Sequence, residues 1–182
     1  MPQGKDDYCR VALDLLAEGG VDALTITNLC GRLGVTTGSF YAHFAGIADF
    51  HQALLRRWED GRISDLEQEL ASVTHPLARI ELLKRLALSL DHEAESAIRA
   101  WARTNPVAAD FQRRVDLVRE TALVLAFTDA GIEKSEAVIL ARIGLTILVG
   151  TQQIEERVDR TRLAKVLDEY ERWVNRAAVR EA

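Results

Sequence analysis

The sequence contains few cysteines and few aromatic residues, and its net charge is negative. The cysteine count and the charge each argue against a class of protein. Two cysteines, Cys9 and Cys30, are too few for a disulfide framework and suit a reducing compartment. The formal net charge of -5 gives none of the overall basic character that nucleic-acid-binding domains often carry. The 182 residues, 48% of them hydrophobic, can still form one large or two small globular domains.

The chain also lacks a long uninterrupted apolar run. The longest one, residues 137–150, contains Arg142 and is shorter than the roughly 20 residues that a transmembrane helix needs. The N-terminal sequence MPQGKDDYCR has no apolar stretch of the signal-peptide kind. We therefore expect a cytoplasmic protein without membrane association.

Sequence patterns of known catalytic sites are missing as well. The sequence contains no Gly-Lys-Ser/Thr phosphate loop, no Ser/His/Asp arrangement, no Cys-x-x-Cys and no His-Glu-x-x-His. A short cluster of Asp91, His92, Glu93 and Glu95 lacks the four-ligand spacing of a metal site. We predict no enzymatic activity, no cofactor and no metal, and an all-α enzyme is the least favoured alternative.

Helical periodicity, in contrast, runs through nearly the whole sequence. Tyr8, Val11, Ala12, Leu15 and Leu16 follow the spacing of one helical face. Helix starts are predicted at Thr25, Thr36, His75-Pro76 and Asn105-Pro106, and helix ends at Gly19-Gly20, Gly34 and Gly131. These signals predict an all-α fold of about nine helices. We place a boundary near Gly46, between a three-helix unit (1–46) and a larger helical domain (47–182).

Two short helices, Thr25–Leu33 and Thr36–His43, are predicted on either side of a tight turn through Gly34 and Val35. This is helix-turn-helix spacing, in which the second helix lies in the major groove of DNA. That helix reads TTGSFYAHF. Its first turn offers short hydroxyl side chains to phosphates and bases, and Gly38 would allow the backbone to approach closely. The spacing fits equally well a plain helix in an all-α bundle, with its aromatic residues in the core.

The stretch LTITNLCGRLGVTTGSFYAHF, from Leu24 to Phe44, resembles the DNA-binding signature of TetR-type transcriptional regulators. The resemblance implies a sequence-specific DNA-binding regulator, a repressor released by a small-molecule effector, which binds a pseudo-palindromic double-stranded operator as a homodimer. We expect Phe40 and Phe44 to pack inward, and Tyr41 and His43 to face phosphate. The predicted DNA-binding residues are Thr25, Thr27, Thr36, Thr37, Gly38, Ser39, Tyr41 and His43.

Two features depart from this pattern. The family commonly has a lysine where this chain has Ile47. Residues 1–46 carry three cations, Lys5, Arg10 and Arg32, against five acidic residues (Asp6, Asp7, Asp14, Glu18 and Asp22), which gives a net charge of -2. We therefore expect hydroxyls and helix N-termini to make more of the phosphate contacts than lysines do. A helical interaction protein that has lost DNA binding remains the alternative.

The resemblance also implies a helical C-terminal domain that dimerises and holds an effector. An apolar stripe in the last two helices favours a dimer interface, although the core of a monomer would show the same pattern. The predicted interface residues are Ala141, Gly144, Leu163, Val166, Leu167, Tyr170, Trp173 and Val174. The predicted effector-binding residues are Trp101, Phe111, Phe127, Arg99, His92 and Gln152.

Overall fold

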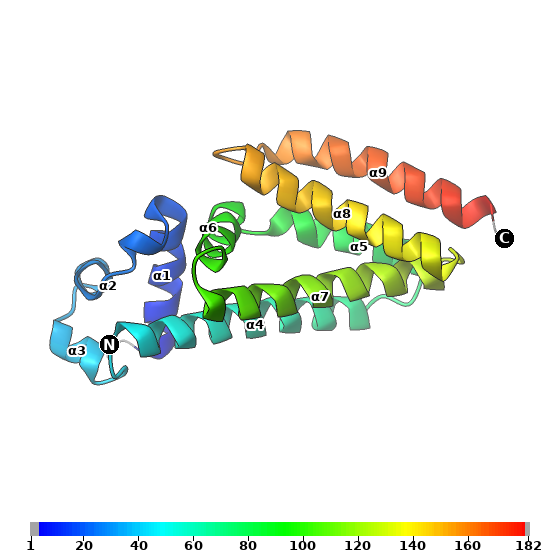
Figure 1. Ribbon diagram of the computed structural model, residues 1–182. Coiled ribbons are helices and arrows are strands. Elements are labelled where there is room, and N and C mark those ends of the chain that lie inside the picture. The colour runs from blue at the N-terminus through cyan, green and yellow to red at the C-terminus, as the bar shows by residue number, and fades with distance from the viewer. Residues whose placement is uncertain (1–3, 181–182) are drawn as a thin grey trace. The chain divides into compact units, whose positions relative to one another are not determined.

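The computed structural model describes residues 4–180, and within this range it contains nine α-helices, one 3₁₀ helix and no strand (Figure 1). The all-α prediction is confirmed. The helices are α1 (Lys5–Gly19), η1 (Val21–Ala23), α2 (Ile26–Leu33), α3 (Thr37–Tyr41), α4 (Ile47–Ala71), α5 (Pro76–Ser89), α6 (His92–Ala102), α7 (Pro106–Asp129), α8 (Lys134–Ile154) and α9 (Arg160–Arg180).

The helix boundaries follow from capping residues in the sequence. The Thr25 side chain accepts a hydrogen bond from the backbone N–H of Asn28 at 3.1 Å, which satisfies a free donor at the start of α2. Pro76 and Pro106 each occupy a first helical position, where the missing N–H has no consequence. Gly34 and Gly131 follow α2 and α7 with φ of 67° and 92°, a conformation that side chains other than glycine rarely adopt.

The helix α3 is shorter than expected. The sequence predicts a helix from Thr36 to His43, whereas the regular helix spans only the five residues Thr37–Tyr41. The chain then turns, with the N–H groups of His43 and Phe44 both donating to the carbonyl of Phe40 at 3.0 Å. Glycine at position 38 lowers the helical propensity of so short a segment, which leaves its last turn tighter than an α-helix.

The chain divides into two compact units. The first comprises the chain up to Gly61 together with Glu93–Arg113, and the second comprises Arg62–His92 and the chain from Arg114 onward. The first unit therefore holds α1, α2 and α3, the first part of α4 and most of α6. In the second unit, α8 and α9 lie side by side and α5 contacts α9 (Figure 1). The predicted domain boundary near Gly46 stays a prediction.

By length and composition alone, α8 resembles a membrane-crossing helix. Within the protein, 39% of its most apolar window is buried. One face of α8 supplies Ala137, Ala141 and Leu148 to the apolar core of the second unit. The opposite face carries further apolar residues, and a core helix with a second apolar face accounts for this composition.

Candidate functional site

The segment α2–turn–α3 has the geometry of a helix-turn-helix. Gly34 closes α2 in the left-handed region, with φ 67° and ψ 33°. The next residue, Val35, donates its N–H to the carbonyl of Cys30 at 3.0 Å, so a carbonyl at the end of α2 gains a partner. Thr36 then caps α3 by accepting from the N–H of Ser39 at 3.4 Å. The turn between the two helices is thus fixed by local hydrogen bonds.

Aromatic residues in and after α3 form a cluster with aromatic residues of α1 and α4. Phe40 and Phe44 are buried, and the fully buried ring of Tyr8, from α1, lies edge-on to both at 5.8 and 5.6 Å. Phe50, from α4, lies 5.7 Å from Phe40 and 5.0 Å from Phe44. These rings anchor α3 to α1 and α4, and aromatic pairs at such spacings stabilise a core beyond their buried area.

Most of the residues predicted to bind DNA lie at the surface. Tyr41 is 58% exposed, and its ring lies edge-on to that of Phe40 at 5.6 Å. Ser39 and His43 are half-buried instead: the Ser39 hydroxyl accepts a hydrogen bond from the Tyr8 hydroxyl at 3.2 Å, and the His43 ring lies 5.8 Å from that of Tyr8. The exposed members of the predicted set are Thr25, Thr27, Thr36, Thr37, Gly38 and Tyr41.

Nothing within the described part of the chain requires glycine at position 38. A Cβ atom built there would meet only the Thr36 hydroxyl oxygen, at the ordinary van der Waals distance of 3.6 Å. The backbone is helical, so φ does not demand glycine either. An exposed helical glycine costs about 1 kcal/mol relative to alanine. It leaves bare backbone exposed at the start of α3.

Three arginines of the first unit form ion pairs with nearby carboxylates. Arg32 binds Glu18 through both terminal nitrogens, at 3.1 and 2.5 Å. The hydrogen bond from Arg32 lowers the pKa of the Glu18 carboxyl below its usual value. Arg10 lies 3.4 Å from Asp7, and Arg57 lies 3.2 Å from Asp6. All these groups are exposed and screened by water, so the pairs are weak and each guanidinium can exchange its carboxylate for phosphate.

His51, on α4, links the segment that leads into α2 to the rest of the first unit. Its ring packs edge-on against Trp101 of α6 at 4.9 Å. Burial lowers the pKa of His51, while a hydrogen bond with the backbone of Leu24 partly opposes that shift. Leu24 directly precedes the Thr25 cap. A neutral His51 therefore holds the entry to α2 in place from the side of α4.

The residues predicted to bind an effector are divided between the two units. Trp101 and Phe111 belong to the first unit and are buried there, with Arg99 half-buried. In the second unit, the buried side chains of His92 and Gln152 contact each other, with 3.1 Å between His92 Nδ1 and Gln152 Nε2. Glu95, from the same acidic cluster as His92, accepts a hydrogen bond from the Trp58 indole at 3.0 Å.

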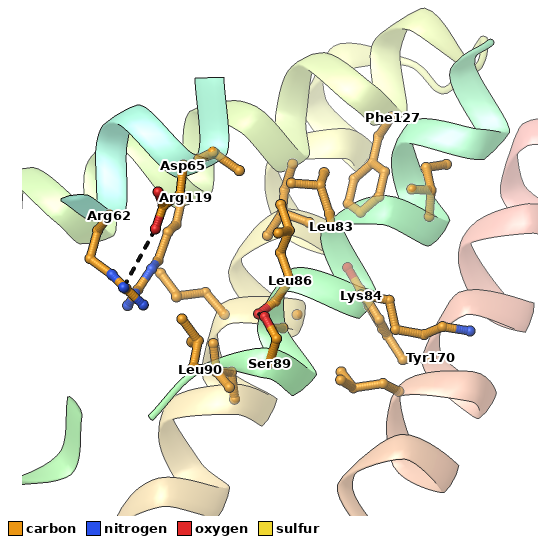
Figure 2. Close-up of a pocket in the computed structure, with 18 residues that line it drawn as sticks. Arg62, Asp65, Leu83, Lys84, Leu86, Ser89, Leu90, Arg119, Phe127 and Tyr170 are labelled. Carbon is orange, nitrogen blue, oxygen red and sulfur yellow. Dashed lines mark hydrogen bonds and ion pairs between the residues drawn. The ribbon is translucent and has the colours of Figure 1, made fainter. Parts of the chain in front are cut away.

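The second unit contains a cavity that is partly open to solvent. Its empty volume, with the adjoining solvent included, is about 990 Å³. Of the six predicted effector residues, Phe127 is the one found among its described lining residues. Figure 2 shows Arg62, Asp65 and Arg119 together at one end of this cavity, and Lys84 beside Tyr170 toward the other. Its walls come from α4, α5, α7, α8 and α9: Arg62, Asp65, Leu66, Ile80, Leu83, Lys84, Leu86, Ala87, Ser89, Leu90, Arg119, Leu123, Phe127, Gly144, Leu145, Leu148, Leu167 and Tyr170.

The predicted dimer residues divide by exposure. Gly144 is buried because the Tyr170 ring lies where a side chain would be: a Cβ at Gly144 would stand 2.8 Å from the Tyr170 hydroxyl oxygen. That hydroxyl donates to the carbonyl of Leu140 at 2.5 Å. The members already covered within the subunit are Ala141, Gly144, Leu163, Leu167, Tyr170 and Val174, whereas Val166 and Trp173 are exposed.

Exposed apolar residues nevertheless lie on both α8 and α9, and we call the surface formed by Ile139, Ile143, Ile147, Ile154, Val166 and Trp173 the α8–α9 face. Ile139, Ile143 and Ile154 are exposed on α8, and the half-buried Ile147 falls on the same helical stripe. Ile147 also lines a shallow groove with Val166 and Trp173 of α9. The same groove contains Arg162, Lys165 and Glu169, and apolar residues rimmed by charged ones in this way are typical of an interaction site.

Comparison with known proteins agrees with the helix-turn-helix geometry. Residues 10–54, which contain this motif, match the family model described as "Bacterial regulatory proteins, tetR family". A curated relative, the HTH-type transcriptional repressor KstR2 from Mycolicibacterium smegmatis, is 26% identical over 76 residues. That match spans 42% of this chain and 37% of the relative.

The fold along the whole chain is similar to that of solved regulators. A transcriptional regulator from Rhodococcus sp. Rha1 superposes with a TM-score of 0.76 at 21% identity, covering 96% of this chain and 97% of that one. A Saccharomonospora viridis regulator in complex with choline gives 0.78 at 16% identity, over 91% and 94% of the two chains. Bacillus subtilis FadR in complex with stearoyl-CoA gives 0.65 at 14%, over 94% and 97%. As the Leu24–Phe44 signature predicts, residues 10–54 match the TetR family of bacterial regulatory proteins, and the fold of the chain is that of solved regulators.

Proposed function

We propose that this protein is a transcriptional repressor that binds a pseudo-palindromic DNA operator as a homodimer and releases it when a small molecule binds. One observation carries the proposal: a row of exposed short polar side chains lies along α2, the turn and α3, and α3 is fixed by the aromatic cluster beneath it. This is the stretch in which the family match falls.

The chemistry of that surface suits DNA. Thr37, on the first turn of α3, can reach base edges or a thymine methyl group, which carry sequence information. Tyr41, near the end of α3, offers a hydroxyl to phosphate, a contact that positions the protein without reading sequence. We propose these roles for the two exposed residues, with Ser39 and His43 contributing from half-buried positions.

The homodimer is proposed on the α8–α9 face. Two recognition helices separated by about one turn of DNA require a fixed pairing of subunits, and a stable pairing buries on the order of 2,000 Å² or more. Ile139, Ile143 and Trp173 give this face the exposed apolar residues that such an interface buries. The covered residues of the predicted set would support the face from beneath.

The effector is proposed to bind in the cavity of the second unit. Cavities that bind small ligands are largely apolar and carry a few placed polar groups, as this one does. A DNA-binding repressor also accounts for the absence of catalytic motifs in the sequence, and we propose a cytoplasmic location because its target would be chromosomal DNA.

The experiment is selection of bound sites from random-sequence duplex DNA at low salt, followed by a gel shift with the selected site. The expected result is enrichment of one pseudo-palindromic sequence, with binding weakened by Thr37→Ala. Thr74, an exposed threonine in the second unit, provides the control substitution Thr74→Ala, which should leave binding unchanged. If no sequence is enriched, the proposal fails in favour of an interaction protein, the reading that the net charge of -2 supports.

A further inference from the structure

The cavity in the second unit has largely apolar walls, with two arginines and an aspartate at one end and Lys84 toward the other. Figure 2 shows the side chains of Arg62, Asp65 and Arg119 together at one end, while Leu83 and Phe127 lie toward the other. The two arginines come from different helices, α4 and α7, and their side chains point toward one another. An occupant must therefore be apolar over most of its length and polar at one end.

The polar groups elsewhere along the wall already have partners. The Lys84 ammonium lies 2.9 Å from Asp168 and 2.5 Å from Glu171. The hydroxyl of Tyr170 donates to the carbonyl of Leu140, and that of Ser89 donates to the carbonyl of Leu86 at 2.9 Å. These groups offer an occupant little new hydrogen bonding, so recognition of a polar group falls to the arginine end.

Arg62 has unused capacity at that end. Its Nε is buried and, among the described residues, has no hydrogen-bond partner. Its terminal nitrogen lies 3.5 Å from Asp65, a loose pair whose carboxylate side chain is 66% exposed. A buried N–H without a partner is destabilising, and a planar carboxylate from an occupant can accept two parallel hydrogen bonds from one edge of a guanidinium, Nε–H included.

The charges at this end limit what the occupant can be. The guanidiniums of Arg62 and Arg119 stand against the carboxylates of Asp65 and Asp116, the latter 4.0 Å from Arg119. If Asp65 turns outward to water, its negative charge moves away from Arg62, and one negative charge of an occupant can take its place. A dianionic phosphate would bring excess negative charge, and a cationic ligand would meet two guanidiniums.

We propose that this cavity binds an apolar monocarboxylic acid, with its carboxylate on Arg62 and Arg119 and its apolar body along Leu83 and Phe127. This deepens the proposed function, since the acid would be the effector. The apolar body is held by burial of its surface, and the carboxylate fixes its orientation. Asp65 competes with the ligand for Arg62, so this carboxylate weakens binding in the native chain.

The test is calorimetric titration of the full chain, without DNA, using dodecanoate, 1-dodecanol and dodecyltrimethylammonium below their aggregation concentrations. Dodecanoate should bind at least about tenfold more tightly than either of the others. Arg62→Gln should reduce dodecanoate affinity about tenfold or more and leave dodecanol affinity unchanged. Arg85→Gln, an exposed arginine of α5 outside the cavity, is the matched control and should change neither.

Asp65→Asn separates this proposal from simple damage to the fold, because it predicts a gain. Removing the competing carboxylate should strengthen dodecanoate binding, a result that misfolding cannot produce. Equal binding of dodecanol, preference for the cation, or unchanged or weaker binding by Asp65→Asn would overturn the proposal. Because the titration contains no DNA, its failure would leave the repressor function standing, and a failure of DNA binding would leave the titration interpretable.

Discussion

The hydroxyl of Tyr8 on α1 donates a hydrogen bond to the hydroxyl oxygen of Ser39 on α3, with 3.2 Å between the two oxygens. This contact connects the buried core of the first unit to the surface proposed to read DNA. It fixes the position of the Ser39 oxygen and leaves the Ser39 hydroxyl proton free to be donated to another group. Ser39 is therefore both part of the core and available as a donor.

Tyr8→Phe tests this connection with little change in shape. Loss of the hydrogen bond should lower the free energy of unfolding by about 0.5–1.5 kcal/mol, and DNA affinity should fall because Ser39 is no longer oriented. Chemical denaturation and a gel shift measure the two effects. Stability that falls while DNA affinity stays the same would mean that Ser39 serves the core alone.

Gly38→Ala should separate stability from DNA binding. The added methyl group has room within the chain and should stabilise the fold by up to about 1 kcal/mol, yet it should weaken DNA binding if the backbone of α3 approaches the duplex. Gly31, an exposed helical glycine of α2 with nothing within 4 Å of a built Cβ, is the matched control. Equal effects of Gly38→Ala and Gly31→Ala on affinity would rule out a close approach at α3.

Trp173→Glu should dissociate the proposed dimer. Trp173 is 49% exposed in the single chain, and a charge placed there would be buried without a partner at the α8–α9 face. Leu77 on α5 is similarly exposed, at 46%, so Leu77→Glu provides a matched control on another surface. Sedimentation velocity should show monomers for Trp173→Glu alone. A wild-type chain that is monomeric at micromolar concentration would contradict the proposed interface.

The buried His51 predicts a dependence of stability on pH. Its pKa is lowered from the ordinary 6.5 in the folded protein, so the unfolded chain binds the proton first as pH falls. The free energy of unfolding should therefore decrease below about pH 6.5 and level off, for this group, below its folded pKa. Urea denaturation between about pH 7.5 and pH 5, a range that spans the ordinary histidine pKa, measures this loss of stability.

His51→Gln should flatten that decrease, whereas His75→Gln, at an exposed histidine, should leave it as in the wild type. The same pH dependence in all three proteins would assign the effect to other groups.

Local signals in the sequence predicted most of the fold. The caps at Thr25 and Thr36, the prolines at 76 and 106 and the glycine at 34 act through neighbouring backbone atoms, so their effect can be deduced from sequence order. The inward and outward roles of Phe40 and Tyr41 follow from helical spacing in the same way.

The cavity could not be predicted, because its residues look like ordinary core or surface in sequence. Arg62 and Arg119 are far apart along the chain, and only the folded unit brings them to one end of a cavity. Trp101 stays a predicted effector residue, and in the structure its ring packs against His51. Helical periodicity likewise could not tell the covered Ala141 from the exposed Ile139, because α8 is apolar on two faces.

The central claim is that α3 reads DNA sequence, and it assigns different roles to Thr37 and Tyr41. The most direct measurement is the affinity of the wild type, Thr37→Ala and Tyr41→Phe for the selected operator and for each of its single-base variants. Tyr41→Phe should weaken every complex alike, by about 0.5–1.5 kcal/mol. Thr37→Ala should reorder the variants at one or two symmetric positions, by about 1–3 kcal/mol. A wild-type protein that binds all variants equally, or a Tyr41→Phe protein that reorders them while Thr37→Ala weakens all alike, would contradict the account.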